Sequence, residues 1–222
     1  MQQLILDIRP DAPPRFANFL PGQNAEAVDA LVHFVAGAVA EPLIYLWGES
    51  GSGKSHLLKA CVQAAQEQGI AAHYCAGGAL PEALPALLAV DDVDALGPEA
   101  QVGLFNLINQ AREGAGRIVV AGSLPPARLA LRPDLTTRLG WGLVFALKPL
   151  SDLERTGALQ SRAAVRGMRL PDEVASYMLN HCRRDLPGLL ATLDALDLFS
   201  LSRKRAVTLP LLREFLQQPG RN

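Results

Sequence analysis

One short stretch constrains this chain more than any other part of its sequence. Residues 48–55 read Gly-Glu-Ser-Gly-Ser-Gly-Lys-Ser and fit the phosphate-binding pattern G-x-x-x-x-G-K-[ST]. The apolar run 43–47 before it is typical of a buried strand, and residues 55–60 after it begin a helical pattern. The motif therefore stands between a strand and a helix, which is the context that a P-loop requires.

The residue types in this loop suit the binding of a polyphosphate. Glycines allow backbone N–H groups to curl around phosphate oxygens, and the following helix N-terminus adds partial positive charge. Lys54 is expected to reach the β- and γ-phosphates, and the Ser55 hydroxyl is expected to ligate Mg²⁺. The sequence thus predicts a chain that binds a purine nucleotide or descends from one that did.

Strands and helices alternate over the first two thirds of the chain. Continuous apolar runs predict strands at 43–47, 70–75, 87–91, 117–121 and 143–147. Helical patterns cover 53–68, 99–113 and 126–139, and an earlier helix is expected from Asn24, as its N-cap, to about residue 40. This alternation predicts an α/β P-loop fold, with a parallel five-stranded sheet covered by helices on both faces.

The pattern changes after residue 149, where no further strand is needed. Ser151 and Glu154 have the spacing of a capping box at the start of a helix to about residue 167. Further helices are predicted near 172–182, 186–202 and 208–217. We therefore expect a flexible N-terminal tail at 1–15, a nucleotide-binding domain at 16–149 and a small all-helical domain at 150–222.

Composition and charge exclude several classes of protein. The formal net charge is −1, and it divides into −4 over residues 1–150 and +3 over residues 151–222. Neither value is the footprint of a strong nucleic-acid binder. No apolar run approaches the roughly 18 residues of a membrane span. Cys61, Cys75 and Cys182 form neither a disulfide framework nor a zinc pattern, which favours a cytoplasmic chain with reduced thiols.

Acidic residues follow the apolar run at 87–90. Asp91 at this strand end is the candidate for holding Mg²⁺, and Asp92 is the candidate for orienting or deprotonating an attacking water. Asp94 is interpreted as a loop or capping acid. Ser123 follows the predicted strand 117–121 and could bridge the water and the γ-phosphate, although a turn-forming serine before two prolines explains it equally well.

Arg138 ends the predicted helix 126–139, just before a glycine turn. It could project toward the γ-phosphate held by a neighbouring chain, or it could be an ordinary surface arginine. Phe16 and Phe19 could pack on the base of the nucleotide or belong to the core. The tail segment Gln3-Leu4-Ile5-Leu6 could add a strand to the sheet edge or dock as a linear motif in a partner's groove.

Several of these segments together resemble one family. The chain resembles the replication-initiator group of AAA+ ATPases, meaning DnaA and its shorter Hda-type relatives. The resemblance is carried by Phe16-x-Asn18-Phe19-x-x-Gly22-x-Asn24, by Gly53-Lys54-Ser55-His56-Leu57-Leu58, by Asp91-Asp92, by Ser123-x-Pro125-Pro126, by Arg138-Leu139-x-Trp141-Gly142 and by Leu147-x-Pro149-Leu150-Ser151-Asp152.

The resemblance implies roles for particular residues. Adenine nucleotide, as ADP or ATP with Mg²⁺ on Ser55 and Asp91, would be held by the loop, two aromatic residues and one lid arginine (Phe16, Phe19, Gly48, Ser50, Gly51, Ser52, Gly53, Lys54, Ser55, His56 and Arg184). Arg138 would be the arginine finger offered to DnaA-bound ATP, with Asp92 and Ser123 as catalytic candidates. Phe105 and Asn109 match positions that the family uses at the DnaA contact, and core packing is the alternative for Phe105.

Two features favour the Hda type. DnaA carries a C-terminal DNA-binding domain for which this chain has no room, and Hda-type proteins begin with a segment that binds the β sliding clamp, which Gln3, Leu4 and Leu6 match. One position departs from the family, because Pro187 stands where a nucleotide-sensing arginine is expected, which puts independent ATP hydrolysis in doubt.

The sequence therefore leads to one main expectation. The chain would be a cytoplasmic inactivator of DnaA that acts with the DNA-loaded clamp, restrains replication initiation, reaches DNA only through the clamp, and does not contact membranes. A homodimer is also possible on the family pattern. The alternative is a self-sufficient AAA+ ATPase of the helicase-loader or clamp-loader type.

Overall fold

The computed structural model describes residues 13–182 and 185–217, which form two compact units. Pro13–Pro149 make up one unit, and the described residues from 150 onward lie in the other. The predicted tail motif at Gln3, Leu4 and Leu6 lies outside the described residues, as does Arg184. None of the described helices is both long and apolar enough to cross a membrane.

The first unit contains the predicted parallel five-stranded sheet. Its strands lie in the order β2-β3-β4-β1-β5, and each adjacent pair is parallel. Their bounds are β1 (Leu43–Trp47), β2 (Ala72–Ala76), β3 (Leu87–Asp91), β4 (Arg117–Gly122) and β5 (Leu143–Ala146). The fold class predicted from the alternating pattern is confirmed.

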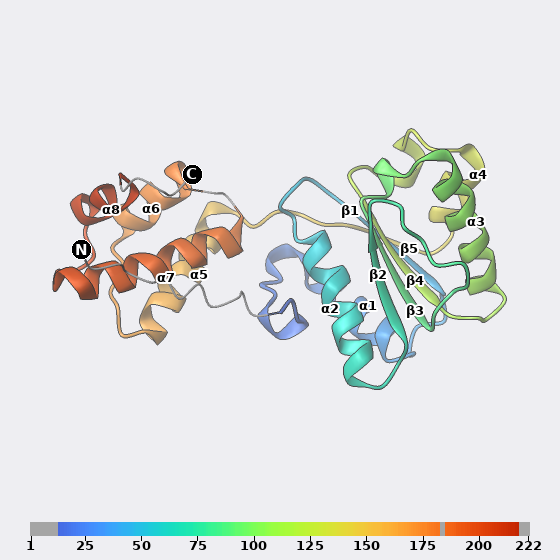
Figure 1. Ribbon diagram of the computed structural model, residues 1–222, viewed down its shortest axis with the longest axis horizontal. Coiled ribbons are helices and arrows are strands. Elements are labelled where there is room, and N and C mark those ends of the chain that lie inside the picture. The colour runs from blue at the N-terminus through green and yellow to red at the C-terminus, as the bar shows by residue number, and fades with distance from the viewer. Residues whose placement is uncertain (1–12, 183–184, 218–222) are drawn as a thin grey trace. The chain divides into compact units, whose positions relative to one another are not determined.

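Helices cover both faces of this sheet, α1 and α2 on one side and α3 and α4 on the other (Figure 1). Side chains alternate along each strand, so Ile44 and Leu46 of β1 join the core under α1 and α2, whereas Leu43 and Tyr45 join the core under α3 and α4. The helices are α1 (Ala25–Val35), α2 (Lys54–Glu67), α3 (Pro98–Arg112) and α4 (Pro133–Leu139).

Several predicted boundaries shift in the structure. The helix expected to reach residue 40 ends at Val35, and the segment expected as one helix at 126–139 consists of a short 3₁₀ turn (Pro126–Arg128) and α4. Strand β2 begins at Ala72 instead of residue 70. Asn24 precedes α1, but its side chain does not cap the helix; it bonds the backbone N and O of Lys148 at 2.8 Å each.

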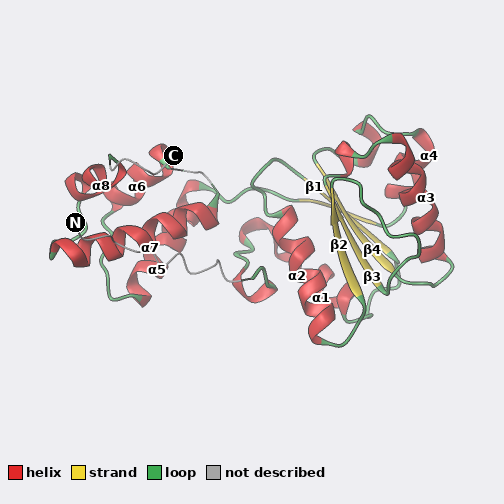
Figure 2. Cartoon of the chain, in the orientation of Figure 1, coloured by secondary structure: helices red, strands yellow, loops and turns green. Residues whose placement is uncertain are grey.

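The second unit consists of helices and loops, as the cartoon shows (Figure 2). Ser151 and Glu154 form the predicted capping box, in which the Ser151 side chain accepts from the Glu154 N–H and the Glu154 side chain accepts from the Ser151 N–H. A separate core of aliphatic and aromatic side chains holds the helices together. They are α5 (Asp152–Val165), α6 (Asp172–His181), α7 (Leu186–Arg203) and α8 (Leu209–Leu216).

Candidate functional site

The parallel strands bring the predicted nucleotide-site residues to one end of the sheet. Strand β4 pairs with β1 on one side, Trp47 opposite Gly122, and with β3 on the other, Val90 opposite Val120. The residues after these strand ends, Gly48, Asp92 and Ser123, therefore follow neighbouring strands at the same carboxyl edge. Ligands of open α/β sheets bind outside this edge.

The P-loop backbone needs its glycines. A Cβ on Gly48 would collide with the carbonyl oxygen of Leu147, and Gly51 has a φ of +80°. Gly53 has a φ of +96°, and a Cβ there would stand 2.6 Å from the Phe19 ring. The backbone is thus left-handed at Gly51 and Gly53 and tightly packed at Gly48. Only glycine fits these three positions without strain.

Lys54 folds over this loop. Its ammonium donates to the carbonyl oxygens of Gly48 at 2.6 Å and of Glu49 at 2.9 Å. Burial lowers the pKa of this ammonium, and three nearby carboxylates counteract the effect (Asp91, Asp92 and Asp94). The lysine charge is therefore held at the loop, close to the acids at the strand ends.

The loop fits a phosphate group. The Ser52 hydroxyl oxygen is buried and has no hydrogen-bond partner in the described residues. The first N–H groups of α2 have no acceptor within the helix, because four orphan donors open every α-helix. An anion at this point would receive those donors and the Lys54 charge.

The same end of the sheet offers a modest fit for Mg²⁺. The Ser55 side chain is exposed at the start of α2, and Asp91 at the end of β3 is buried. Among the described residues no group of three His, Cys, Asp or Glu side chains could hold a metal. Mg²⁺ held here would have to share its ligands with phosphate oxygens, as in other P-loop sites.

Asp91 is held in place by donors on both carboxylate oxygens. The Tyr74 hydroxyl donates to Oδ2 at 2.7 Å, and the Asp92 N–H donates to Oδ1 at 3.0 Å. Burial and this hydrogen bond raise the pKa of Tyr74, so the phenol stays a neutral donor. Asp92 is exposed and has a φ of 49°, which is uncommon outside glycine and typical of functional sites.

Ser123 is bonded to Asp94. The Ser123 N–H and hydroxyl donate to the two carboxylate oxygens of Asp94, at 2.8 Å each. Asp94 thus caps the turn after β4, in agreement with its interpretation as a loop acid. Tyr45, whose side chain is fully buried, fixes the same turn by donating from its hydroxyl to the Leu124 carbonyl at 2.7 Å.

Phe16 and Phe19 pack partly against the core under α1 and α2. Phe19 also contacts the loop, because its ring lies beside Gly53 and 5.4 Å from the His56 ring. His56 in turn bonds the Arg15 carbonyl at 3.1 Å. Both phenylalanines thus pack partly on the core, and Phe19 and His56 form a half-buried wall next to the P-loop.

Arg138 lies at the opposite end of the sheet. It lies in the last turn of α4, and the turn after the helix brings Gly142 against the Leu43 carbonyl at the amino end of β1. The Arg138 guanidinium stacks over the rings of Phe105 and Trp141, with its Cζ 4.3 Å from each centroid. Such cation–π contacts hold a guanidinium without neutralising its charge.

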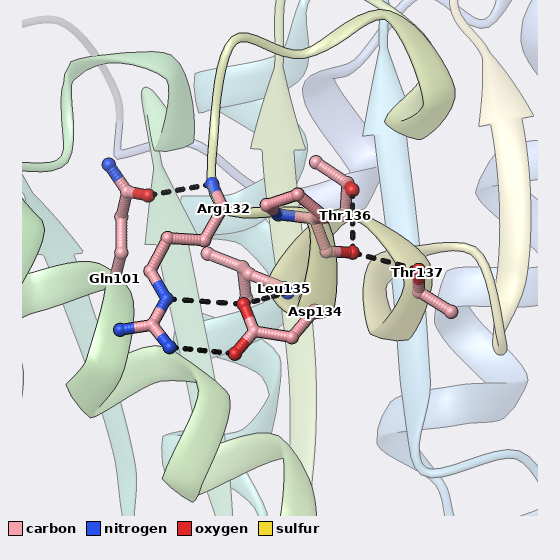
Figure 3. A network of polar contacts seen from close by, with 7 residues as sticks. Gln101, Arg132, Asp134, Leu135, Thr136 and Thr137 are labelled. Atoms are coloured by element: carbon pink, nitrogen blue, oxygen red, sulfur yellow. Dashed lines mark hydrogen bonds and ion pairs between the residues drawn. The ribbon is translucent and has the colours of Figure 1, made fainter.

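A polar network fixes the start of α4 and hence the direction of the helix that carries Arg138 (Figure 3). The Arg132 guanidinium donates twice to Asp134, at 3.1 and 2.8 Å, and the Arg132 N–H donates to Gln101 of α3 at 3.0 Å. Arg132 also lowers the pKa of the Asp134 carboxyl. The helix is therefore anchored on α3 at one end and presents Arg138 at the other.

The remaining predicted residues lie on α3 and α7. Phe105 and Asn109 are half-buried on α3, and the Phe105 ring contacts both the core and Arg138. Pro187 is in the first turn of α7, where the Asp185 side chain caps the helix by accepting from the Gly188 N–H at 2.8 Å. Pro187 therefore occupies the position at which the resemblance implies a nucleotide-sensing arginine.

Sequence reasoning missed the roles of the Tyr74 and Tyr45 hydroxyls and of the Trp141 ring. Tyr74 and Tyr45 sit in strands whose apolar pattern predicts only core packing, and their partners are distant in sequence. Trp141 belongs to a recognised segment, but nothing in its spacing indicates contact with two arginines, Arg138 and Arg112, each 4.3 Å from its ring. A tyrosine in the strand that precedes the acidic strand end at Asp91 is the one signal that could have drawn attention to Tyr74.

Comparisons with known proteins agree with this geometry. Residues 152–216 match the family model described as the Hda lid domain. This match covers most of the helical unit, from the start of α5 to the end of α8.

Solved structures share the fold of both units. Domain III of the Thermotoga maritima replication initiation protein DnaA is 23% identical, with a TM-score of 0.69, over 92% of this chain and 97% of that chain. AMPPCP-bound DnaA from Aquifex aeolicus is 20% identical, with a TM-score of 0.70, over 86% and 68%. The Thermotoga maritima RuvB branch migration motor is 15% identical, with a TM-score of 0.66, over 92% and 72%.

The chain therefore shares its fold with DnaA, and its helical unit matches the Hda lid domain over residues 152–216.

Proposed function

We propose that this chain is an Hda-type inactivator of DnaA. It binds adenine nucleotide and Mg²⁺ at its own P-loop and is tethered to the DNA-loaded β sliding clamp through Gln3, Leu4 and Leu6. It then offers Arg138 to ATP held by DnaA, which accelerates hydrolysis there and restrains replication initiation. Its contact with DNA is indirect, through the clamp in the cytoplasm.

The single observation that carries this proposal is the position of Arg138. Arg138 lies beside the amino end of β1, whereas the P-loop follows the carboxyl end of the same strand. Five strand residues span roughly 16 Å at about 3.3 Å each. That separation keeps Arg138 away from the nucleotide of its own chain, so the guanidinium suits the nucleotide of another molecule.

Nucleotide binding is supported by the chemistry of the loop and by the fold. The Lys54 ammonium, the orphaned Ser52 hydroxyl and the start of α2 converge where phosphates would lie. The proposed nucleotide contacts are Phe16, Phe19, Gly48, Ser50, Gly51, Ser52, Gly53, Lys54, Ser55, His56 and Arg184. Bound Mg²⁺ would polarise phosphate oxygens, and Ser55 and Asp91 would orient the ion.

Turnover by the chain itself is expected to be slow. The Ser123 hydroxyl donates to Asp94, so it is not directed to a water, and Pro187 supplies no cation from the lid. Asp92 would be the remaining candidate for orienting a nucleophile. We therefore assign the bound nucleotide, ADP or ATP, a mainly structural part in this chain.

The partner contact is proposed on α3. The Phe105 ring contacts the Arg138 guanidinium, and Asn109 lies one helical turn further along the same helix. A partner that reaches Arg138 would meet both side chains. Because the tether raises the local concentration of this surface, a weak contact between AAA+ domains is enough for the reaction.

The proposal is tested by the rate of hydrolysis of DnaA-bound ATP in the presence of clamp-loaded DNA. Wild type, Gln3→Ala and Arg138→Ala are compared, each at equal nucleotide occupancy. Arg138→Ala should abolish stimulation with loaded clamp and without it. Gln3→Ala should lose only the part that depends on the clamp, and stimulation equal to wild type in both variants would contradict the proposal.

The alternative is a self-sufficient ATPase of the loader type, which the intact P-loop and Asp91 would also suit. This alternative predicts steady turnover without DnaA that Lys54→Ala abolishes. Measuring phosphate release by the chain alone separates the two functions, because the inactivator should show little release until DnaA is added.

A further inference from the structure

Arg112 stands next to the proposed finger and has no role in the proposal above. It is the last residue of α3, is exposed, and lies with its Cζ 4.3 Å from the Trp141 ring centroid. Arg138 lies at the same distance from the same centroid. The two guanidinium carbons are therefore no more than twice 4.3 Å apart.

Neither of these arginines forms an ion pair with an acid among residues 13–182 and 185–217. Most other arginines of the described residues form ion pairs, for example Arg132 with Asp134 and Arg162 with Asp194. Arg112 and Arg138 form none with a described carboxylate, and both contact the half-exposed Trp141, whose exposed fraction is 47%. Two like charges at this separation repel each other unless an anion lies between them.

Both arginines line one hollow of about 300 Å³, whose other walls come from α3, the start of β1 and the turn after α4. Trp141 contributes a flat wall, and Pro42, Leu43 and Ile108 contribute apolar walls. Of the described residues that line it, none carries a carboxylate. The volume is at the lower end for a ligand site, and the charge of the rim calls for a small, highly negative group.

We propose that Arg112, Arg138 and Trp141 form a two-arginine site for the triphosphate of a nucleotide bound to the partner, in which Arg112 is a second phosphate-contacting residue. Guanidinium forks bind phosphate oxygens bidentately, and two Cζ atoms no more than twice 4.3 Å apart can contact oxygens of one polyphosphate chain. The Trp141 ring contacts both guanidinium groups and thereby orients them. This inference rests on the proposed function, since it assigns a second residue to the same interface.

The site itself is tested without any partner. The chain has two tryptophans, and Trp47→Phe leaves Trp141 as the single emitter. Inorganic tripolyphosphate titrated into this full-length variant at low salt should change the Trp141 emission in a saturable manner. Adding Arg112→Ala or Arg138→Ala should each weaken the apparent affinity roughly ten- to a hundredfold, as expected for loss of a charged hydrogen-bond donor.

Two control variants make this result decisive. Adding Arg169→Ala removes an equal charge from the lid and should leave the midpoint unchanged. Adding Lys54→Ala removes the P-loop cation and should preserve the Trp141 response. An absent response, a response that Lys54→Ala abolishes, or equal binding after Arg112→Ala would each overturn the two-arginine site.

Hydrolysis of DnaA-bound ATP then separates this inference from the proposal on which it rests. Both Arg112→Ala and Arg138→Ala should lower stimulation, with the smaller loss, roughly ten- to a hundredfold, for Arg112→Ala. If Arg138→Ala is inactive and Arg112→Ala is fully active, only the second arginine is refuted. If Arg138→Ala is fully active, the proposed function itself fails.

Discussion

The polar side chains at the two ends of the central sheet are held in different ways. At the carboxyl end, polar groups bind one another: Tyr74 donates to Asp91, Ser123 donates to Asp94, and Lys54 donates to the P-loop carbonyls. At the amino end, Arg112 and Arg138 lie on aromatic rings and meet no described carboxylate.

This difference indicates where each end is directed. At the carboxyl end, Lys54, Asp91 and Asp94 all have hydrogen-bond partners within the chain and form a cradle for one ligand. A guanidinium on an aromatic ring keeps its full charge and its donors, so the amino end is arranged for an anion that another molecule brings. The following predictions test that contrast, beginning with the largest effect.

Arg138→Ala should have the largest effect, and that effect should be confined to the function of the amino end. Stimulation of DnaA-bound ATP hydrolysis should fall by about 10³-fold or more, the usual value of an arginine finger. The affinity of the chain for its own ADP, measured by calorimetry, should stay within the error of wild type. Arg138→Lys is the matched control and should recover little, since a lysine lacks the planar fork; a parallel loss of ADP binding would break the contrast.

Lys54→Ala should affect the opposite end. Loss of a charged donor to phosphate should weaken ADP binding roughly ten- to a hundredfold. The tripolyphosphate response of Trp141 should persist, because the two ends are separated by the length of β1. Equilibrium dialysis with labelled ADP and the Trp141 titration measure the two quantities on one preparation. Loss of both together would show that the ends are coupled.

Tyr74→Phe should have a smaller effect, confined to the carboxyl end. It removes the donor to Asp91 Oδ2 and leaves a buried carboxylate oxygen without that bond, at a cost of about 1–3 kcal/mol in the free energy of unfolding. The Mg²⁺ concentration that half-saturates ADP binding should also change. Chemical denaturation and a Mg²⁺ titration check both expectations, and Tyr177→Phe in the lid is the matched control.

Ligand binding at the two ends should also differ in its pH dependence, with a smaller effect than the substitutions above. Only the ammonium form of Lys54 attracts phosphate, and burial lowers the pKa of this group. ADP binding should therefore weaken several-fold as the pH rises from about 7 to about 10, below the range of an exposed lysine. Lys54→Arg should remove this dependence because its guanidinium stays charged. Tripolyphosphate binding at Trp141 should show no such weakening, because both guanidinium groups stay charged over this range.

Prediction from sequence succeeded where local pattern and topology act together. The five strands and the capping box of Ser151 were foreseen, because each depends on residues close in sequence. The convergence of Gly48, Asp92 and Ser123 followed from one rule about parallel sheets. The role of the Asn24 side chain was missed, because its partner Lys148 is 124 residues away.

The sequence alone determined that this chain has a P-loop between a strand and a helix, a parallel sheet and a separate helical domain, because those features reside in spacing and periodicity. Only the tertiary structure decided that Tyr74 holds Asp91, that Asp94 takes the Ser123 hydroxyl, and that Arg112 and Arg138 share Trp141. Each of these contacts joins side chains from different elements. Their meeting depends on strand order and helix packing, which no local pattern encodes.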